Sequence, residues 1–175
     1  KKQKRYRRNF KMGKILIHII IALAFSIGAL TSCSSDGCLE NQSSIPLAGF
    51  YDSESKQAIV LNSLEVYGIG ATGDSLLTTN GVETKQTYLP FRSTQKNTAF
   101  CFHYTEFGET NAYNDTIWFD YESTPYFASE ECGAMFRYKI TSVRHTDILI
   151  DSVTITDPEI TNVDVERIKI YFKTN

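Results

Sequence analysis

The feature that most constrains the fold of this chain is an alternation of side chains after residue 46. Phe100, Phe102 and Tyr104 alternate with small or polar neighbours, and the same period of two recurs further along the chain. The other alternating segments are residues 116–121, 136–141, 148–155 and 168–173. This spacing places one face of a strand on a core and the other face in water. The phase changes once, near Asp151 and Ser152, which indicates a β-bulge.

No segment after Cys33 repeats with the 3.6-residue period of a helix, and β-branched and aromatic residues fill the alternating segments. Turn-forming residues separate these segments, at Gly73-Asp74, Asn80-Gly81, 111–115 and Asp157-Pro158. The sequence therefore predicts an all-β domain over residues 47–175. We expect an antiparallel β-sandwich of about eight short strands, and a small β-barrel is the alternative.

The first 32 residues have a different character, because they contain eight basic residues and no acidic one. An apolar run over residues 15–27 leads into Leu30-Thr31-Ser32-Cys33. This tetrapeptide resembles the lipobox of bacterial lipoprotein signals: an aliphatic residue, two small residues and a cysteine. We expect residues 1–32 to be removed as a signal peptide, with Met12 as its natural start, and Cys33 to be lipidated. An uncleaved membrane anchor is the weaker alternative, since the apolar run is short for a span.

The charge is also unevenly divided. The chain has 18 basic and 20 acidic residues, and eight of the basic ones precede Cys33, so the part that follows has a formal charge near −10. Nucleic-acid binding depends on cationic contacts with phosphate, so this acidic body argues against a nucleic-acid partner. It also argues against adsorption to anionic lipid heads. Residues 33–46 are polar and rich in turn formers, and we interpret them as a lipidated tether.

Three cysteines remain once Cys33 carries lipid, which is an odd number in an oxidising compartment. Cys101 lies in mid-strand and is predicted to be a buried free thiol. Cys38 in the tether and Cys132 in a polar loop can approach each other more freely, so a Cys38–Cys132 disulfide is the favoured pairing. Three free thiols or a Cys101–Cys132 bridge are the alternatives. The cysteine and histidine spacings match no zinc site, and we expect no metal and no cofactor.

Catalytic constellations are hard to find in this sequence. His103 shares a strand face with Cys101, but residues two apart on a strand lie about 7 Å from each other, too far for direct proton transfer. His145 is predicted to lie at the surface. Gly68, Gly70 and Gly73 match the dinucleotide-binding pattern by letter, yet no helix follows them, so we predict a glycine-rich turn. We therefore expect a protein that is not an enzyme.

Acidic residues gather near the C-terminus, where their spacing matches no calcium-binding loop. They are Asp151, Asp157, Glu159, Asp164 and Glu166. A solvated acidic rim is the interpretation we favour.

Several short segments resemble, as a set, a family of uncharacterised lipoproteins from Bacteroidetes. They are Phe50-Tyr51-Asp52, Tyr88-Leu89-Pro90-Phe91, Asp115-Thr116-Ile117, residues 129–133 around Cys132, and Ile168–Phe172. Together with the lipobox and Cys38, they cover nearly the whole mature chain. The resemblance supports the Cys38–Cys132 pairing and implies no activity, because that family has none assigned.

The same resemblance implies possible O-glycosylation, because Bacteroidetes modify Asp-Ser/Thr motifs of exported proteins. Ser75, Thr116 and Ser152 each follow an aspartate and precede an apolar residue. Ser75 lies nearest a predicted turn and is the best candidate. Thr116 and Ser152 are also compatible with ordinary strand positions.

These features together predict a cell-envelope lipoprotein that acts as a non-catalytic binding or assembly module. The alternatives are a carbohydrate-binding protein that uses exposed aromatics such as Trp118 or Tyr113, or an envelope hydrolase of glycan or peptide. Residue 34 is Ser, not the Asp of an inner-membrane retention signal, so we expect outer-membrane location. Only Asp36 is acidic close to Cys33, which favours the periplasmic face over surface exposure.

Overall fold

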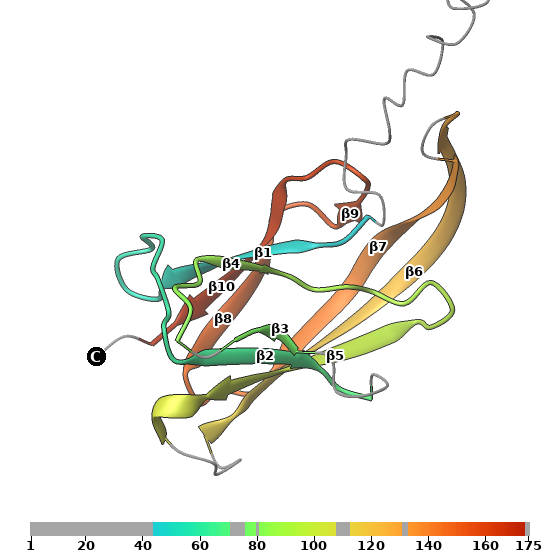
Figure 1. Cartoon of the computed structure of the whole chain (residues 1–175). Helices are drawn as coiled ribbons and strands as arrows, with labels where there is room; N and C mark the ends of the chain where they lie inside the picture. Colours follow the sequence, from blue (N-terminus) through green and yellow to red (C-terminus); the bar gives the residue numbers. More distant parts are fainter. Residues whose placement is uncertain (1–43, 71–75, 80, 108–112, 131–132, 174–175) are drawn as a thin grey trace, which may run out of the picture. The chain divides into compact units, whose positions relative to one another are not determined.

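Two β-sheets make up the domain in a computed structural model that describes residues 44–70, 76–79, 81–107, 113–130 and 133–173 (Figure 1). The small sheet has the order β4–β1–β10–β8, with β1 at Leu47–Asp52, β4 at Gln86–Tyr88, β8 at Ile150–Ile155 and β10 at Glu166–Phe172. The large sheet has the order β3–β2–β5–β6–β7–β9. Its strands are β2 (Leu64–Gly68), β3 (Leu76–Thr78), β5 (Asn97–Tyr104), β6 (Asp115–Ser129), β7 (Gly133–His145) and β9 (Glu159–Ile160). A 3₁₀ turn, η1 (Thr105–Phe107), follows β5.

The core lies between the two sheets and consists of the alternating residues. Phe100, Phe102 and Tyr104 of β5 are 1%, 0% and 5% exposed, so the inward face predicted for this segment is confirmed. The inward residues of β6 and β10 are buried as well: Ile117, Phe119 and Tyr121, and Ile168, Ile170 and Phe172. Aromatic rings pack against one another in this layer. The ring of Phe91 stacks on that of Tyr121 with centroids 4.4 Å apart.

The sandwich is confirmed over the barrel, since the two sheets keep separate edge strands, β4 and β8 in one and β3 and β9 in the other. One pair departs from the predicted antiparallel order: β1 runs parallel to β10 in the centre of the small sheet. A period of two specifies which face of a strand is buried, but it carries no information on strand direction. The part of the chain that the structure describes contains no helix with the length and hydropathy that a transmembrane span requires.

Two local expectations had opposite outcomes. The predicted bulge is confirmed: Tyr171 pairs with Ser152 and Phe172 with Ile150, so Asp151 is the extra residue on β8. Phe136 was predicted to face the core with Tyr138 and is instead 39% exposed. Phe136 lies beyond Tyr138, the last residue in this direction of β7 that pairs with β9.

Candidate functional site

The hairpin of β6 and β7 extends well beyond its neighbours in the large sheet. β5 pairs only with Asp115–Asp120 of β6, and β9 pairs only with Tyr138 and Lys139 of β7. Residues 122–130 and 133–137, which we call the arm, are therefore paired as strands only with each other. In Figure 1 the arm projects past the ends of the other labelled strands.

One face of the arm carries a row of exposed apolar residues. Pro125 lies opposite Phe136 and Phe127 lies opposite Ala134, so these four side chains share a face. Phe127 is 69% exposed and Phe136 is 39% exposed. Contiguous exposed apolar residues of this kind often mark an interaction site, whereas single ones are common on any surface.

The base of the arm is joined to the domain by buried groups. Met135 is only 5% exposed, and a cavity of about 570 Å³ beside it is lined by residues that include Ile45, Phe91, Phe136 and Tyr138. Phe91 is followed in its loop by Arg92. The backbone N–H of Arg92 donates to the Tyr121 hydroxyl at 3.0 Å, and this hydroxyl donates to the Arg92 carbonyl at 2.9 Å. The arm therefore extends from a well-fixed base.

At the opposite end of β6, the buried carboxylate of Asp115 collects five hydrogen bonds. The hydroxyls of Tyr104 and Thr146 donate to it at 2.9 and 2.5 Å. Three successive backbone N–H groups also donate, at 2.7–2.9 Å, from Ile148, Leu149 and Ile150. Asp115 is 0% exposed, so these bonds replace its water shell completely. The network ties β5, β6 and the connection between β7 and β8 together.

Two hydrogen-bond partners of Asp115 line a cleft between the ends of the two sheets. This cleft, with a volume of about 460 Å³, is lined on one side by residues 60–64, Tyr104 and Glu106, and on the other by Leu149, Phe172 and Lys173. Tyr104 and Leu149 are both hydrogen-bonded to Asp115, so the carboxylate fixes residues in both walls.

Most of the predicted modification sites lie outside the described residues: Cys33, Cys38, Cys132 and Ser75. The lipid anchor and the Cys38–Cys132 bridge therefore remain predictions. Cys101 is buried and free, as predicted.

The two other candidate glycosylation residues lie on strands. Thr116 is half-buried in β6, next to the fully buried Asp115, and its backbone N–H donates to the Thr146 hydroxyl. Ser152 is half-buried in β8 and follows the bulged, exposed Asp151. Their modification remains a prediction.

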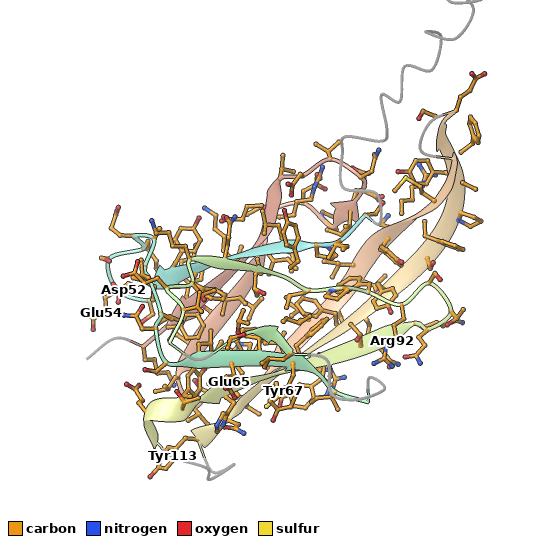
Figure 2. The ribbon with its side chains drawn as sticks, viewed as in Figure 1. Asp52, Glu54, Glu65, Tyr67, Arg92 and Tyr113 are labelled. Carbon is orange, nitrogen blue, oxygen red and sulfur yellow. The ribbon has the colours of Figure 1, made fainter. Side chains whose placement is uncertain are left out.

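The residues considered for catalysis or glycan binding make local contacts, and Asn114 is a hydrogen-bond partner of both His103 and Cys101. His103 Nδ1 lies 2.8 Å from Asn114 Oδ1, His145 Nδ1 lies 2.6 Å from the Thr146 carbonyl, and burial raises the pKa of the Cys101 thiol. The Arg144 guanidinium lies 5.8 Å from the centre of the half-buried Trp118 ring. Tyr113 projects away from the sheets and is 47% exposed (Figure 2).

The turn predicted at Gly68, Gly70 and Gly73 follows β2. Gly70 has a φ of +69°, a conformation that favours glycine, and Gly73 lies outside the described residues.

The C-terminal acidic residues are spread over the surface, and four of them have partners on other elements. Asp157 pairs with Arg167, Glu159 with Lys139 at 3.7 Å, Asp164 accepts from the Tyr88 hydroxyl, and Glu166 accepts from the Tyr51 hydroxyl. No group of three His, Cys, Asp or Glu side chains in the described ranges is arranged to hold a metal ion.

The Tyr51–Glu166 pair yields a measurable prediction. The Glu166 carboxylate accepts a 2.6 Å hydrogen bond from Tyr51, and this bond, with burial and the nearby negative charge, raises the pKa of Tyr51 to about 12. Glu166→Gln is expected to lower that pKa towards the ordinary value of about 10. Tyrosine labelled with ¹³C at Cζ reports each phenol separately by NMR, and Tyr51→Phe assigns the signal.

The control for this titration is Asp164→Asn, which removes the carboxylate that raises the pKa of Tyr88 and should leave Tyr51 unchanged. Gly49→Ala should act like Glu166→Gln, since a Cβ at Gly49 would lie 1.9 Å from Glu166 Oε2 and displace that side chain. An unaltered Tyr51 titration in Glu166→Gln would show that the hydrogen bond does not form in solution.

Taken together, the fold and surface define an all-β protein of two packed sheets with a projecting hairpin arm. The chain belongs to the family of unknown function DUF6452, whose family model matches residues 63–172. This match runs from the start of β2 to the end of β10 and so includes the arm and Asp115. The chain has no significant match among curated proteins or among solved structures.

Proposed function

We propose that this protein is a lipid-anchored, non-catalytic module of the cell envelope that binds another protein through its arm. The observation that carries the proposal is the row formed by Pro125, Phe127, Ala134 and Phe136, which is exposed on a hairpin with a fixed base. Burying this row against a partner would remove apolar surface from water, and this is the main driving force for protein association.

The arm favours side-chain packing over strand addition as its binding mode. Pro125 has no N–H and lies in β6 beyond the last residue that β5 pairs with. Proline at such an edge discourages a further strand from pairing. A partner would therefore contact the face of the arm, where Phe127 and Phe136 supply aromatic contact area.

Charge and targeting features support a protein partner in the envelope. The formal charge near −10 after Cys33 disfavours nucleic acid and anionic lipid surfaces. Lipidation at Cys33, with Ser34 next to it, would place the domain at the outer membrane, and the single Asp36 favours its periplasmic face. The carbohydrate-binding alternative has less support, since the Arg144 guanidinium already lies over the ring of Trp118.

Site-specific photocrosslinking in cells tests the arm. A photoreactive phenylalanine analogue at Phe127 or Phe136 should form a discrete crosslinked protein band. The same analogue at Val82 is the matched control, because Val82 is 55% exposed and lies outside the arm. Phe136→Ser should weaken the band formed from position 127. Crosslinking that is absent at both arm positions, or equal at Val82, would contradict the proposal.

A further inference from the structure

The cleft between the ends of the two sheets combines apolar side chains in its floor with the carboxylate of Glu106 at its rim. Its floor contains Leu64, Tyr104 and Phe172, which are 1%, 5% and 3% exposed. Leu61 and Leu149 are half-buried along its walls, and Val60 is 42% exposed at the rim. The volume of about 460 Å³ is within the range of small-molecule sites, and the lining also includes the polar residues Asn62 and Ser63.

The walls of the cleft are fixed by backbone hydrogen bonds. The Thr105 N–H donates to the Ser63 carbonyl at 2.9 Å, and the Lys173 N–H donates to the Leu149 carbonyl at 2.8 Å. Asp115 holds Tyr104 and Leu149 from below. A ligand would therefore enter a site that is already formed, which reduces the entropy cost of binding.

The two charged residues of the cleft differ in their availability. The Lys173 ammonium donates to the Asp147 carboxylate and to the carbonyls of Asp147 and Ile148, so its charge is already balanced. Glu106 lies on η1 and is exposed, and its carboxylate forms no ion pair with any residue that the structure describes. The net electrostatic preference at the rim is therefore for a cation.

We propose that this cleft binds a small primary amine with an apolar body, the body resting on Leu64, Leu149 and Phe172 and the ammonium facing Glu106. The site is separate from the arm and does not depend on the proposed arm partner.

The test is methyl NMR on the full chain in lipid nanodiscs, with Leu and Val methyl groups labelled. Phenethylamine is the probe, and phenylacetate and 2-phenylethanol present the same ring with a negative or a neutral end. Phenethylamine should shift the methyl signals of Val60, Leu61, Leu64 and Leu149 saturably, and it should bind more tightly than either analogue.

Two variants connect binding to the cleft. Glu106→Gln should weaken phenethylamine binding about fivefold, the range expected for one exposed ion pair, while Glu122→Gln on the arm should have no effect. Val60→Arg places a positive charge on the exposed rim and should abolish binding without altering the core. The proposal is overturned if the three probes bind equally, if Glu106→Gln binds like the unmodified chain, or if the cleft methyls do not shift.

Discussion

Replacing Asp115 by alanine is expected to lower the free energy of unfolding by about 4 kcal/mol or more. The change leaves two hydroxyls and three backbone N–H groups without their acceptor in a position that is 0% exposed. A buried donor without an acceptor costs roughly 1–3 kcal/mol, and water entering the space would recover part of the sum. Chemical denaturation of the mature chain measures the loss.

A graded series separates the carboxylate from its individual donors. Asp115→Asn retains one acceptor oxygen but turns an NH₂ group towards backbone donors, so its cost should lie below that of alanine. Tyr104→Phe removes one of the five bonds and should cost about 1 kcal/mol. An Asp115→Ala variant no less stable than Tyr104→Phe would show that the network contributes little to stability.

Replacing Cys33 by serine is expected to abolish lipid labelling completely. The thiolate is the nucleophile that the lipid transferase alkylates, and a serine hydroxyl cannot replace it at neutral pH. Without the lipid, the dedicated peptidase has no substrate, so the precursor should persist with residues 1–32 attached. Incorporation of a clickable fatty acid and the gel mobility of the protein measure both effects.

The matched control for this experiment is Cys38→Ser, five positions downstream, which should label and mature normally. Undiminished labelling in Cys33→Ser would contradict the lipobox assignment and leave the uncleaved anchor as the interpretation. Labelling that is lost in both variants would indicate a general defect in export or stability.

The inward faces of the strands could be predicted from the sequence because they are determined locally. Every second residue of a half-buried strand must be apolar, so Phe100, Ile117 and Ile168 were predicted to be buried without knowledge of their partners. The bulge at Asp151 was predictable for the same reason, since a change of phase in the alternation requires an extra residue.

The role of Asp115 was missed, although a signal for it is present. Asp115 lies two and four positions before Ile117 and Phe119 and so shares their strand face. A charged residue therefore occupies a position that the alternation assigns to the core. Its neighbours in the sequence instead indicated a turn and a glycosylation motif. Its donors lie 11 to 35 positions away along the chain, and only the folded arrangement of β5, β6 and β8 brings them together.

By itself, the sequence determined the fold class, the buried face of most strands and the signal-like character of residues 1–32, since each of these depends on neighbouring residues. The tertiary structure alone decided that β1 lies parallel to β10 and that Phe136 is exposed on an arm. It also decided that Glu106 lies at the rim of the cleft, where it forms no ion pair with any residue that the structure describes. These features depend on which strands become neighbours and on where their pairing ends. The two-residue alternation of side chains carries no information on either.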